Sequence, residues 1–319
     1  MLSLYHQVLI ALALDILLGD PEGFPHPVRL MGRAAKAIEA PLRRLIPAER
    51  FAGIVAALLI CCGSAALVYG ATELSAEFHP LLRDILSIYV MYSCIALRDM
   101  MRHSSAVHTA LKQGDIAKAR QQLSRIVGRD TEQLDGPGIV RAAVESVAES
   151  TVDGVLAPLF FCFLAGPAGA IFHKAASTLD STFGYTTERY IRFGWASARL
   201  DDLLNWIPAR LSGVFISGAA LLTREHPIAS LRIFFRDGRN HASPNAGWPE
   251  AAFAGALGVQ LGGTNLYGGE KIEKPTIGDA LHALTPDLIS RANRLLFVAT
   301  LINVAVNTAV NTGTVYYFP

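Results

Sequence analysis

The sequence predicts an all-α fold, a polytopic integral membrane protein built as a helical bundle with about four to six membrane segments. Of its 319 residues, 51% are hydrophobic and only 17% are charged, whereas a typical soluble domain has about 25% charged residues. Apolar runs of roughly membrane-spanning length also recur along the chain. The shortage of charge and the recurring runs both indicate a bilayer environment, with additional cytoplasmic helices and loops between the membrane segments.

The apolar runs define the candidate membrane segments. They lie at 2–18, 51–71, 81–97, 154–172, 203–222 and 295–312. The second run, FAGIVAALLICCGSAALVYGA, contains no charged residue and fits a spanning helix. The first run lacks the basic start and the small-residue cleavage site of a signal peptide, so we expect it to belong to the folded protein.

Two of these runs contain proline. Pro158 and Pro167 lie in 154–172, and Pro208 lies in 203–222. Proline removes a helical hydrogen bond, and non-helical backbone at membrane depth is tolerated only where protein or a water-filled cavity surrounds it. We therefore expect both segments to be broken, re-entrant or buried against protein.

The distribution of Lys and Arg predicts an orientation. Segment 19–50 holds six of these residues and segment 98–150 holds eight, whereas segment 72–80 holds none. The positive-inside rule then places 19–50 and 98–150 in the cytoplasm and 72–80 outside. Segment 223–294, with eight Lys or Arg, also looks cytoplasmic, although its length gives it less weight.

This orientation leaves the charged stretch 173–211 with two alternatives. If 154–172 and 203–222 both span the bilayer, the stretch lies outside, where there is no ATP. If they are re-entrant or form a helical hairpin, the stretch faces the cytoplasm. The sequence leaves both alternatives open.

We predict one integral membrane enzyme domain over 1–319, with 98–150 and 223–294 largely cytoplasmic. The stretch TALKQGDIAKARQQLSRIVGRD has helical periodicity, and Gly128 is a candidate helix stop. Segment 223–294 is rich in Gly and Pro and is expected to be irregular for much of its length.

Net charge and cysteine content exclude some functional classes. The formal net charge is +1, which argues against a protein that binds nucleic-acid phosphates through a basic face. The four cysteines lie in apolar runs and none forms a CxxC motif. We therefore expect neither a zinc site nor a disulfide framework.

Acidic residues recur in the stretch ESVAESTVDG. Glu145, Glu149 and Asp153 are spaced i, i+4, i+8, so on a helix they share one face. Like charges at this spacing repel, and Mg²⁺ prefers carboxylate oxygens combined with phosphate. The pattern indicates either a divalent-metal site or a solvated helix face.

The stretch SARLDDLLNWIPARL combines Asp201, Asp202 and Asn205 with Arg199 and Arg210. Acidic residues against an apolar run are costly unless they are paired, and they often mark function. We favour a functional cluster over the alternative, in which Arg–Asp pairs join two helices.

The stretch KAASTLDS places Lys174 and Asp180 near the hydroxyls of Ser177 and Thr178. A lysine with hydroxyls and carboxylates can hold phosphate and metal. The alternative is a lysine that extends its ammonium group to the membrane interface. No Walker A motif is present.

Polar residues crowd the stretch FFRDGRNHASPNAGWPE, and Arg236, His241 and Asn245 are its main candidates for anion and amide recognition. The glycines that follow in LGG and YGG are interpreted as simple turns. Near the start of the chain, Asp20 and His26 are further residues that could reach a site.

Several of these stretches together resemble the CobD/CbiB family of cobalamin biosynthesis. The motifs that carry the resemblance are GDPEGFPHPVRLMG, IVGRDT, AESTVDGVLAPLFF, KAASTLDSTFGY, SARLDDLLNWIPARL and RDGRNHASPNAGWPEAAFAGALGVQLGG. They run in order from about Leu14 to Arg294, nearly the whole chain. Ser150 and Ser177 stand where the family often has Asn, and each keeps a small polar group.

The resemblance implies a multi-pass enzyme of the cytoplasmic (inner) membrane with its active site on the cytoplasmic side. The implied activity is that of an adenosylcobinamide-phosphate synthase, an ATP-dependent carbon–nitrogen ligase. It would join adenosylcobyric acid to (R)-1-amino-2-propanol phosphate, or to aminopropanol, with ATP as a substrate and Mg²⁺ as the cofactor. Expected partners are these substrates, the lipid bilayer and other late corrin-pathway enzymes, with an oligomer possible and nucleic acid not expected.

This chemistry assigns roles to the candidates, because phosphoryl transfer needs cations and metal ligands and amide formation needs a base. The catalytic candidates are Lys174, Asp180, Asp201, Asp202 and His241. The candidates for substrate or phosphate binding are Arg199, Arg210, Arg236, Asn205, Asn245, Ser177 and Thr178. The metal candidates are Glu145, Glu149, Asp153, Asp201 and Asp202.

Other functional classes stay open at this point. An intramembrane prenyltransferase also uses Asp-rich helices and Mg²⁺, but only DDLLN is close to its paired acidic motifs. A corrinoid transporter would carry intramembrane Asp, Arg and Asn, and we find no inverted repeat of the kind that many transporters have. A non-catalytic membrane scaffold for corrin enzymes is the remaining alternative.

Overall fold

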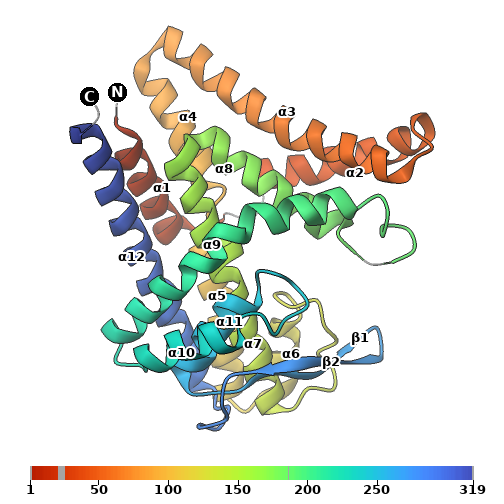
Figure 1. Ribbon diagram of the computed structural model, residues 1–319, viewed down its shortest axis with the longest axis vertical. Helices are drawn as coiled ribbons and strands as arrows, with labels where there is room; N and C mark the ends of the chain where they lie inside the picture. Colours follow the sequence, from red (N-terminus) through yellow and green to blue (C-terminus); the bar gives the residue numbers. More distant parts are fainter. Residues whose placement is uncertain (1, 21–25, 186, 318–319) are drawn as a thin grey trace. The chain divides into compact units, whose positions relative to one another are not determined.

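The computed structural model describes residues 2–20, 26–185 and 187–317, with side chains described as far as residue 310. It is built mainly of α-helices (Figure 1). These are α1 (Leu4–Leu18), α2 (Pro27–Leu45), α3 (Glu49–Phe78), α4 (Pro80–Tyr92), α5 (Leu97–Lys112), α6 (Ile116–Leu123), α7 (Gly136–Ser150), α8 (Ala157–Phe183), α9 (Trp195–Leu222), α10 (Pro227–Asp237), α11 (Gly247–Leu257) and α12 (Asp287–Tyr317). A π-helical turn, η1 (Thr151–Leu156), joins α7 to α8.

Within the described residues, four helical segments are long and apolar enough to cross a membrane. They are Glu49–Phe78, Pro80–Lys112, Gly136–Phe183 and Asp287–Val310. Four of the predicted apolar runs lie in these segments, whereas the run 2–18 forms the shorter α1 and the run 203–222 lies in α9. The prediction of an all-α polytopic membrane protein is confirmed.

The hairpin of β1 (Leu261–Tyr267) and β2 (Glu270–Ile277) is the departure from the all-helical prediction. It lies in a segment that we expected to be irregular. Gly268 and Gly269 both have positive φ, 58° and 82°, which is the conformation of a two-residue hairpin turn. The interpretation of this pair of glycines as a simple turn is confirmed.

The chain forms two compact units. Unit 1 comprises Met1–Ala96, Ala157–Asn205 and Asn307–Pro319, and unit 2 comprises Leu97–Leu156 and Trp206–Val306. Unit 2 therefore contains both segments that were predicted to be cytoplasmic. The prediction of a single domain stays a prediction.

In unit 1, α3 packs against α2, α4 and α8. Large apolar side chains of α3 remain exposed, including Leu58, Leu59 and Phe78. Exposed apolar groups at this density are expected to face lipid in a spanning helix. The amphipathic α2 turns Met31, Ala35 and Leu42 inward and keeps its Lys and Arg side chains largely at the surface.

The helix α8 breaks at Ala165 and Gly166, where the backbone leaves the helical conformation. A methyl group added at Gly169 would lie 2.8 Å from the Phe161 carbonyl oxygen, although eight residues along a straight helix span about 12 Å. The rings of Phe161 and His173 also stack, 5.1 Å apart. The two halves of α8 therefore fold back on each other, which confirms that the apolar run 154–172 is broken.

The second proline-containing run behaves differently. Residues 203–222 continue without interruption in α9, with Pro208 inside the helix. Of the three alternatives, the break is wrong there, whereas the burial of Ala209, Ile216 and Ala220 agrees with a segment that packs against protein. A single proline removes one helical hydrogen bond, and α9 remains helical on both sides of Pro208 despite this loss.

After the break, the chain of unit 1 returns to α2 and the first turns of α3. The carbonyl oxygen of Phe193 lies so close to Gly53 that no Cβ would fit between them. Arg189 contacts Glu39 of α2 at 3.0 Å. The stretch from 173 to 193 thus runs toward the end of α3 that lies away from the α3–α4 turn (Figure 1), which supports the hairpin alternative.

In unit 2, α5 packs on α6 and α7, and α10 packs on α11. The predicted helical stretch at 109–130 is divided, because Gly114 adopts φ 74° and Asp115 caps a new helix by accepting from Lys118 N–H. The helix α6 ends at Leu123, before the expected stop at Gly128. Helices form on both sides of Gly114, as the periodicity predicts, but this glycine interrupts the helix.

Replacing Gly166 tests the break in α8. Gly166 has φ 60° and ψ −150°, a region that is almost exclusive to glycine. We expect Gly166→Ala to lower the stability by about 1–3 kcal/mol, measured as a lower melting temperature of the detergent-purified protein. The control is Gly63→Ala in α3, where nothing lies within 4 Å of an added methyl and helix propensity favours alanine. Equal melting of the two variants would contradict the strained turn.

Candidate functional site

A buried ion pair organises the candidate site in unit 2. Arg129 Nη2 lies 2.5 Å from Glu145 Oε2, and both side chains are less than one-tenth exposed. The other oxygen of Glu145 accepts from Gly262 N–H at 2.7 Å. Glu145, on the buried face of α7, thus ties the loop that precedes α7 to the start of β1.

A second arginine strengthens the same connection. Arg141 donates to the carbonyls of Gly262 and Thr264 at 2.5 and 2.8 Å, and Asn265 accepts from Arg129 at 2.6 Å. Gly262 has φ 80° and lies at a register shift of the hairpin. Gly262 therefore lies in a β-bulge, and its N–H binds the Glu145 carboxylate. The interpretation of the glycines in LGG as a simple turn is incomplete.

Glu250 and His241 form the interior of the site. Glu250 is only 5% exposed, and its Oε1 lies 3.8 Å from His241 Nε2. Burial, followed by the negative charges of Glu145 and Glu149, raises the pKa of Glu250 well above its usual range, and Lys274 and Arg129 only partly oppose this. Glu250 is thus a carboxyl group that binds its proton unusually tightly.

His241 is held in one neutral form. Its Nδ1 accepts from Ser243 N–H at 3.0 Å, so a neutral ring carries its proton on Nε2, toward Glu250. Burial and the nearby Lys274 ammonium lower the pKa of His241, against the opposing effect of Ser243 and Glu145. In this geometry the Nε2–H of His241 faces Glu250 from 3.8 Å, beyond hydrogen-bond distance. The predicted role of His241 as a base passes more naturally to a carboxylate.

Two less buried charges complete this cluster. Glu149 is exposed, and Lys274 of β2 is half-buried. Within the described chain Lys274 has no carboxylate within ion-pair distance, although its charge acts on Glu149 and Glu250. A half-buried ammonium group without a paired carboxylate is suited to hold an anionic ligand.

Arg210 and Asn245 are brought together in unit 2. Arg210 Nη1 donates to Asn245 Oδ1 at 2.8 Å. The guanidinium lies over the rings of Trp206 and Trp248, at 4.5 and 5.0 Å from their centroids. The Arg210 guanidinium is a planar cation that stacks against two aromatic rings, and such a cation is suited to bind carboxylate or phosphate.

Arg236 occupies a different environment. Its Nε and Nη2 pair with both oxygens of Asp237, at 2.7 and 2.8 Å, and Nη2 also reaches Asp279 at 2.9 Å. The Arg236 guanidinium holds the pKa of Asp237 below its usual value. Two carboxylates already surround this arginine, so the phosphate-binding role predicted for it has weaker support than for Arg210.

In unit 1, His173 of α8, which was not among the predicted site residues, forms a polar chain with the predicted Asn205 and Asp201 of α9. His173 Nε2 lies 2.9 Å from Asn205 Oδ1, and Asn205 Nδ2 donates to Asp201 Oδ2 at 3.0 Å. His173 is fully buried, and its Nδ1 has no hydrogen-bond partner among the described residues. This chain fixes the Asp201 carboxylate through a neighbour one helical turn away.

Further candidates of unit 1 lie on the returning half of α8. Lys174, Ser177 and Asp180 are half-buried, and Thr178 Oγ1 donates to the Lys174 carbonyl at 2.7 Å. The methyl group of Thr178 lies close to Gly32 of α2. The predicted phosphate-binding stretch therefore packs beside the basic helix α2.

Other predicted residues lie outside the polar clusters described above. Asp202 pairs loosely with Arg199 at 3.5 Å. Asp153 is half-buried in the π-helical turn. Across the described ranges, no three His, Cys, Asp or Glu side chains converge in a metal-binding arrangement, and Glu145 is occupied by Arg129 and Gly262 N–H.

Sequence reasoning did not include several residues of this cluster among the candidates. Arg129 lies in the motif IVGRDT, and Glu250 lies in a polar stretch that was singled out, but neither received a role. Lys274 and Asn265 lie in the hairpin, where the glycines suggested only turns. The one sequence feature that could have indicated Lys274 is the density of charge in EKIEK, which follows Gly268 and Gly269.

Comparison with known proteins gives a consistent result over the whole chain. A family model described as CobD/Cbib protein matches residues 8–296. The chain is 47% identical over 305 residues to the cobalamin biosynthesis protein CobD of Geobacter metallireducens, covering 96% of each chain. It is 45% identical over 304 residues to CobD of Citrobacter koseri, covering 94% of this chain and 95% of the relative.

A relative with the other family name is similarly close. The cobalamin biosynthesis protein CbiB of Salmonella typhi is 43% identical over 307 residues, which cover 95% of this chain and 96% of the relative. No solved structure matches the chain.

The raised pKa of Glu250 has a consequence for stability. Above pH 4.5, the ordinary value for the group, the unfolded chain releases a proton that the folded chain retains, so stability falls as the pH rises toward the folded pKa. We expect Glu250→Gln to raise the melting temperature by roughly a few degrees at pH 7–8, with no gain below pH 4.5. The control is Glu132→Gln at an exposed carboxylate. A pH-independent difference would exclude the titration as its cause.

Proposed function

Because the chain belongs to the CobD/CbiB protein family, whose relatives act in cobalamin biosynthesis, we propose that it is an adenosylcobinamide-phosphate synthase. In the proposed reaction, adenosylcobyric acid is joined through an amide bond to (R)-1-amino-2-propanol phosphate, or to aminopropanol. The family membership supports the pathway. The ligase reaction, its substrates and its use of ATP and Mg²⁺ are the proposal.

The proposed chemistry has two steps. A carboxylate is a poor acyl donor, so one of its oxygens first takes the terminal phosphoryl group of ATP, which releases ADP and leaves an acyl phosphate. The amine nitrogen then attacks the carbonyl carbon, phosphate leaves, and a base accepts the proton that the nitrogen loses. The protein must therefore supply positive charge near phosphate oxygens and a proton acceptor near the amine.

The pairing of Glu250 with His241 is the observation that supports an acid–base role in unit 2. A carboxylate whose pKa is raised is a stronger base than an ordinary one, and His241 Nε2–H faces it at 3.8 Å. We assign Glu250 as the proton acceptor and His241 as the residue that orients it. Glu149 is the exposed carboxylate of the same cluster.

Cationic residues of the same unit fit the anionic groups of the substrates. Lys274 and Arg210 are half-buried, and Arg210 retains the planar donor geometry that suits carboxylate and phosphate. We assign both to anion binding, with Asn245 as the amide partner that holds Arg210 in position.

In unit 1, we assign Lys174, Ser177 and Thr178 to nucleotide phosphate. Mg²⁺ is usually held by one or two carboxylates together with phosphate oxygens. Asp201 and Asp202 are the carboxylates that would hold it. When bound, Mg²⁺ would offset negative charge on the phosphates.

The proposed location is the cytoplasmic membrane, with the active site on the cytoplasmic side. Residues 173–193 return to α2, which belongs to the basic segment 19–50. The positive-inside rule assigns that segment to the cytoplasm, where ATP is available.

A ligation assay tests the proposed reaction. Purified protein in detergent receives adenosylcobyric acid, aminopropanol phosphate, ATP and Mg²⁺, and each component is then omitted in turn. We expect amide product only when all four are present, with ADP and phosphate formed in equal amounts. Folded protein that gives no product with either form of the amine would favour a scaffold or transporter. Product without ATP would exclude a ligase.

Variants of the assigned residues test their roles. Glu250→Gln is expected to lower the rate by about 10²-fold or more, as for loss of a general base. Lys174→Gln and Asp201→Asn are expected to raise the KM for MgATP. Lys118→Gln, at an exposed position of α6, is the control and should change neither value.

The pH dependence distinguishes the base from a merely structural residue. Because Glu250 must be ionised to accept a proton, the rate should fall on acidification with an apparent pKa above 4.5, the ordinary value of the group. The residual rate of Glu250→Gln should lack this acidic limb. An unchanged limb in the variant would show that another group is the base.

A further inference from the structure

The helix α10 of unit 2 has one face that the rest of the unit covers. Ile233 and Phe234 on this face are buried. Ser230 Oγ donates to the Ala252 carbonyl of α11 at 2.9 Å and accepts from Ser217 Oγ of α9 at the same distance. These contacts hold α10 against α9 and α11, so the direction of its other face is fixed.

The other face of α10 is also apolar, and the described residues leave it largely exposed. Ile228, Leu231 and Phe235 are 83%, 39% and 72% exposed, and their i, i+3, i+7 spacing places them along one side of the helix. Leu221 and Leu222, at the end of α9, are exposed as well. Exposed apolar side chains at this density mark a surface that another molecule or a membrane contacts.

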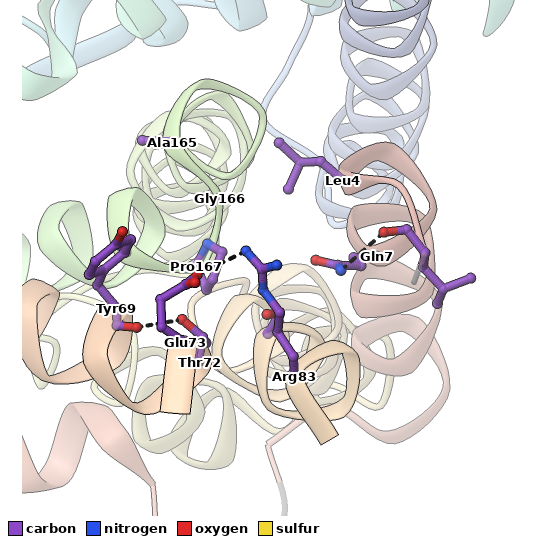
Figure 2. A pocket seen from close by; sticks show the side chains of 12 residues that line it. Leu4, Gln7, Tyr69, Thr72, Glu73, Arg83, Ala165, Gly166 and Pro167 are labelled. Atoms are coloured by element: carbon purple, nitrogen blue, oxygen red, sulfur yellow. Dashed lines mark hydrogen bonds and ion pairs between the residues drawn. The ribbon is translucent and has the colours of Figure 1, made fainter. Parts of the chain in front are cut away.

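Arginines lie beside this apolar face and at both ends of it. Arg224, Arg232 and Arg239 are exposed, and in the described chain none of them has a carboxylate within ion-pair distance. Elsewhere in the protein such arginines are paired, and Figure 2 shows Arg83 joined to Glu73 at 2.9 Å. The three guanidinium groups around α10 are therefore suited to bind anionic groups of a partner.

The acidic residues of the same stretch are already occupied. Between positions 221 and 239 they are Glu225 and Asp237. Glu225 accepts from Arg291 Nε at 2.9 Å, and Asp237 accepts from Arg236 Nε at 2.7 Å. The outer surface of α10 thus combines apolar side chains with positive charge, and this charge is complementary to an anionic surface.

The backbone at Arg224 indicates that its side chain has a role. Arg224 has φ 61°, and among the described residues no other residue except glycine has a positive φ. Glycine adopts this conformation without strain, whereas strain at other residues is often associated with function. The presence of an arginine in this turn therefore favours a binding role for its guanidinium group.

A contact with α12 relates the start of α10 to the membrane. The pair of Glu225 and Arg291 joins the α9–α10 turn to α12. Arg291 is four residues into the segment Asp287–Val310, which is long and apolar enough to span a bilayer, so it lies about 6 Å from the start of that segment. The helix α10 therefore begins near the end of a membrane segment, at the level of the lipid headgroups.

We infer that the outer face of α10 lies on the membrane surface and binds anionic phospholipids. Ile228, Leu231 and Phe235 enter the boundary between headgroups and acyl chains. Because these side chains extend over about 10 Å of the helix and reach one depth, the helix axis runs along the surface. The three arginines contact the lipid phosphates, as in other amphipathic helices that bind a membrane surface.

Spin labels on α10 of the whole chain in lipid vesicles test this inference. Cys62→Ser removes the exposed native cysteine, and Ile228→Cys or Phe235→Cys then takes the label. The vesicles contain phosphatidylcholine and phosphatidylglycerol. We expect these labels to collide more often with oxygen, which dissolves in lipid, than with a water-soluble nickel chelate. A label at Lys118→Cys, on the exposed surface of α6, is the control and should show the reverse.

The same label at Phe235→Cys tests the arginines. A Lys or Arg near an anionic surface contributes about 1 kcal/mol, so replacing Arg224, Arg232 or Arg239 by Gln should weaken the insertion of α10 about fivefold each. The label should then collide more often with the nickel chelate, as it should in vesicles of phosphatidylcholine alone. The control is Arg83→Gln, which removes the paired arginine of Figure 2 and should leave the label unaffected.

Three outcomes would overturn the inference. Frequent collisions with the nickel chelate in the anionic vesicles would show that this face of α10 lies in water. Dipolar coupling between the labels of two molecules, with protection from both oxygen and the chelate, would show that a second copy of the chain covers it. Equal insertion with and without phosphatidylglycerol would exclude a role for anionic lipid.

Discussion

The backbone at Gly166 is the constraint on which unit 1 depends. In hydrocarbon, every backbone N–H and C=O must find a partner within the protein, so a chain can reverse direction at membrane depth only where other helices enclose it. Gly166 permits the reversal because it has no Cβ, with φ 60° and ψ −150°, and Gly169 permits the close approach to Phe161. The returning half of α8 carries Lys174 and the hydroxyls of Ser177 and Thr178 back to α2, so the location of these side chains follows from one glycine turn.

Unit 2 depends on a different interaction, the buried pair of Arg129 and Glu145. A buried charge is tolerated only when it is paired and hydrogen-bonded, and Glu145 meets both conditions through Arg129 and Gly262 N–H. The pair fixes the β-hairpin against α7 and so places Lys274 within electrostatic reach of Glu149 and Glu250. Removing one partner would leave the other as an uncompensated buried charge.

These two constraints explain why so apolar a chain concentrates its charge in a few stretches. Most Lys and Arg of α2 face outward, where the positive-inside rule places cations. In unit 2 the side chains of Glu145 and Glu250 are buried, and burial raises the pKa of Glu250. Burial makes the ionised form of Glu250 less stable in the folded protein. Carboxyl groups with such raised pKa values are often found where a protein performs acid–base chemistry.

The sequence by itself determined the helical membrane class, most of the apolar segments, the broken run 154–172 and the family, because these depend on composition, local periodicity and ordered motifs. It also selected Lys174, Asp201, Asn205, Arg210 and Asn245, which the structure places in polar clusters of their own units. Only the tertiary structure decided that Glu145 is occupied by Arg129 and Gly262, that Arg236 is enclosed by Asp237 and Asp279, and that Lys274 joins Glu250. The physical reason is that these contacts join residues far apart in the sequence. Periodicity reports on neighbours one turn apart, whereas Glu145 and Gly262 are 117 residues apart in sequence and meet only because a hairpin packs against a helix.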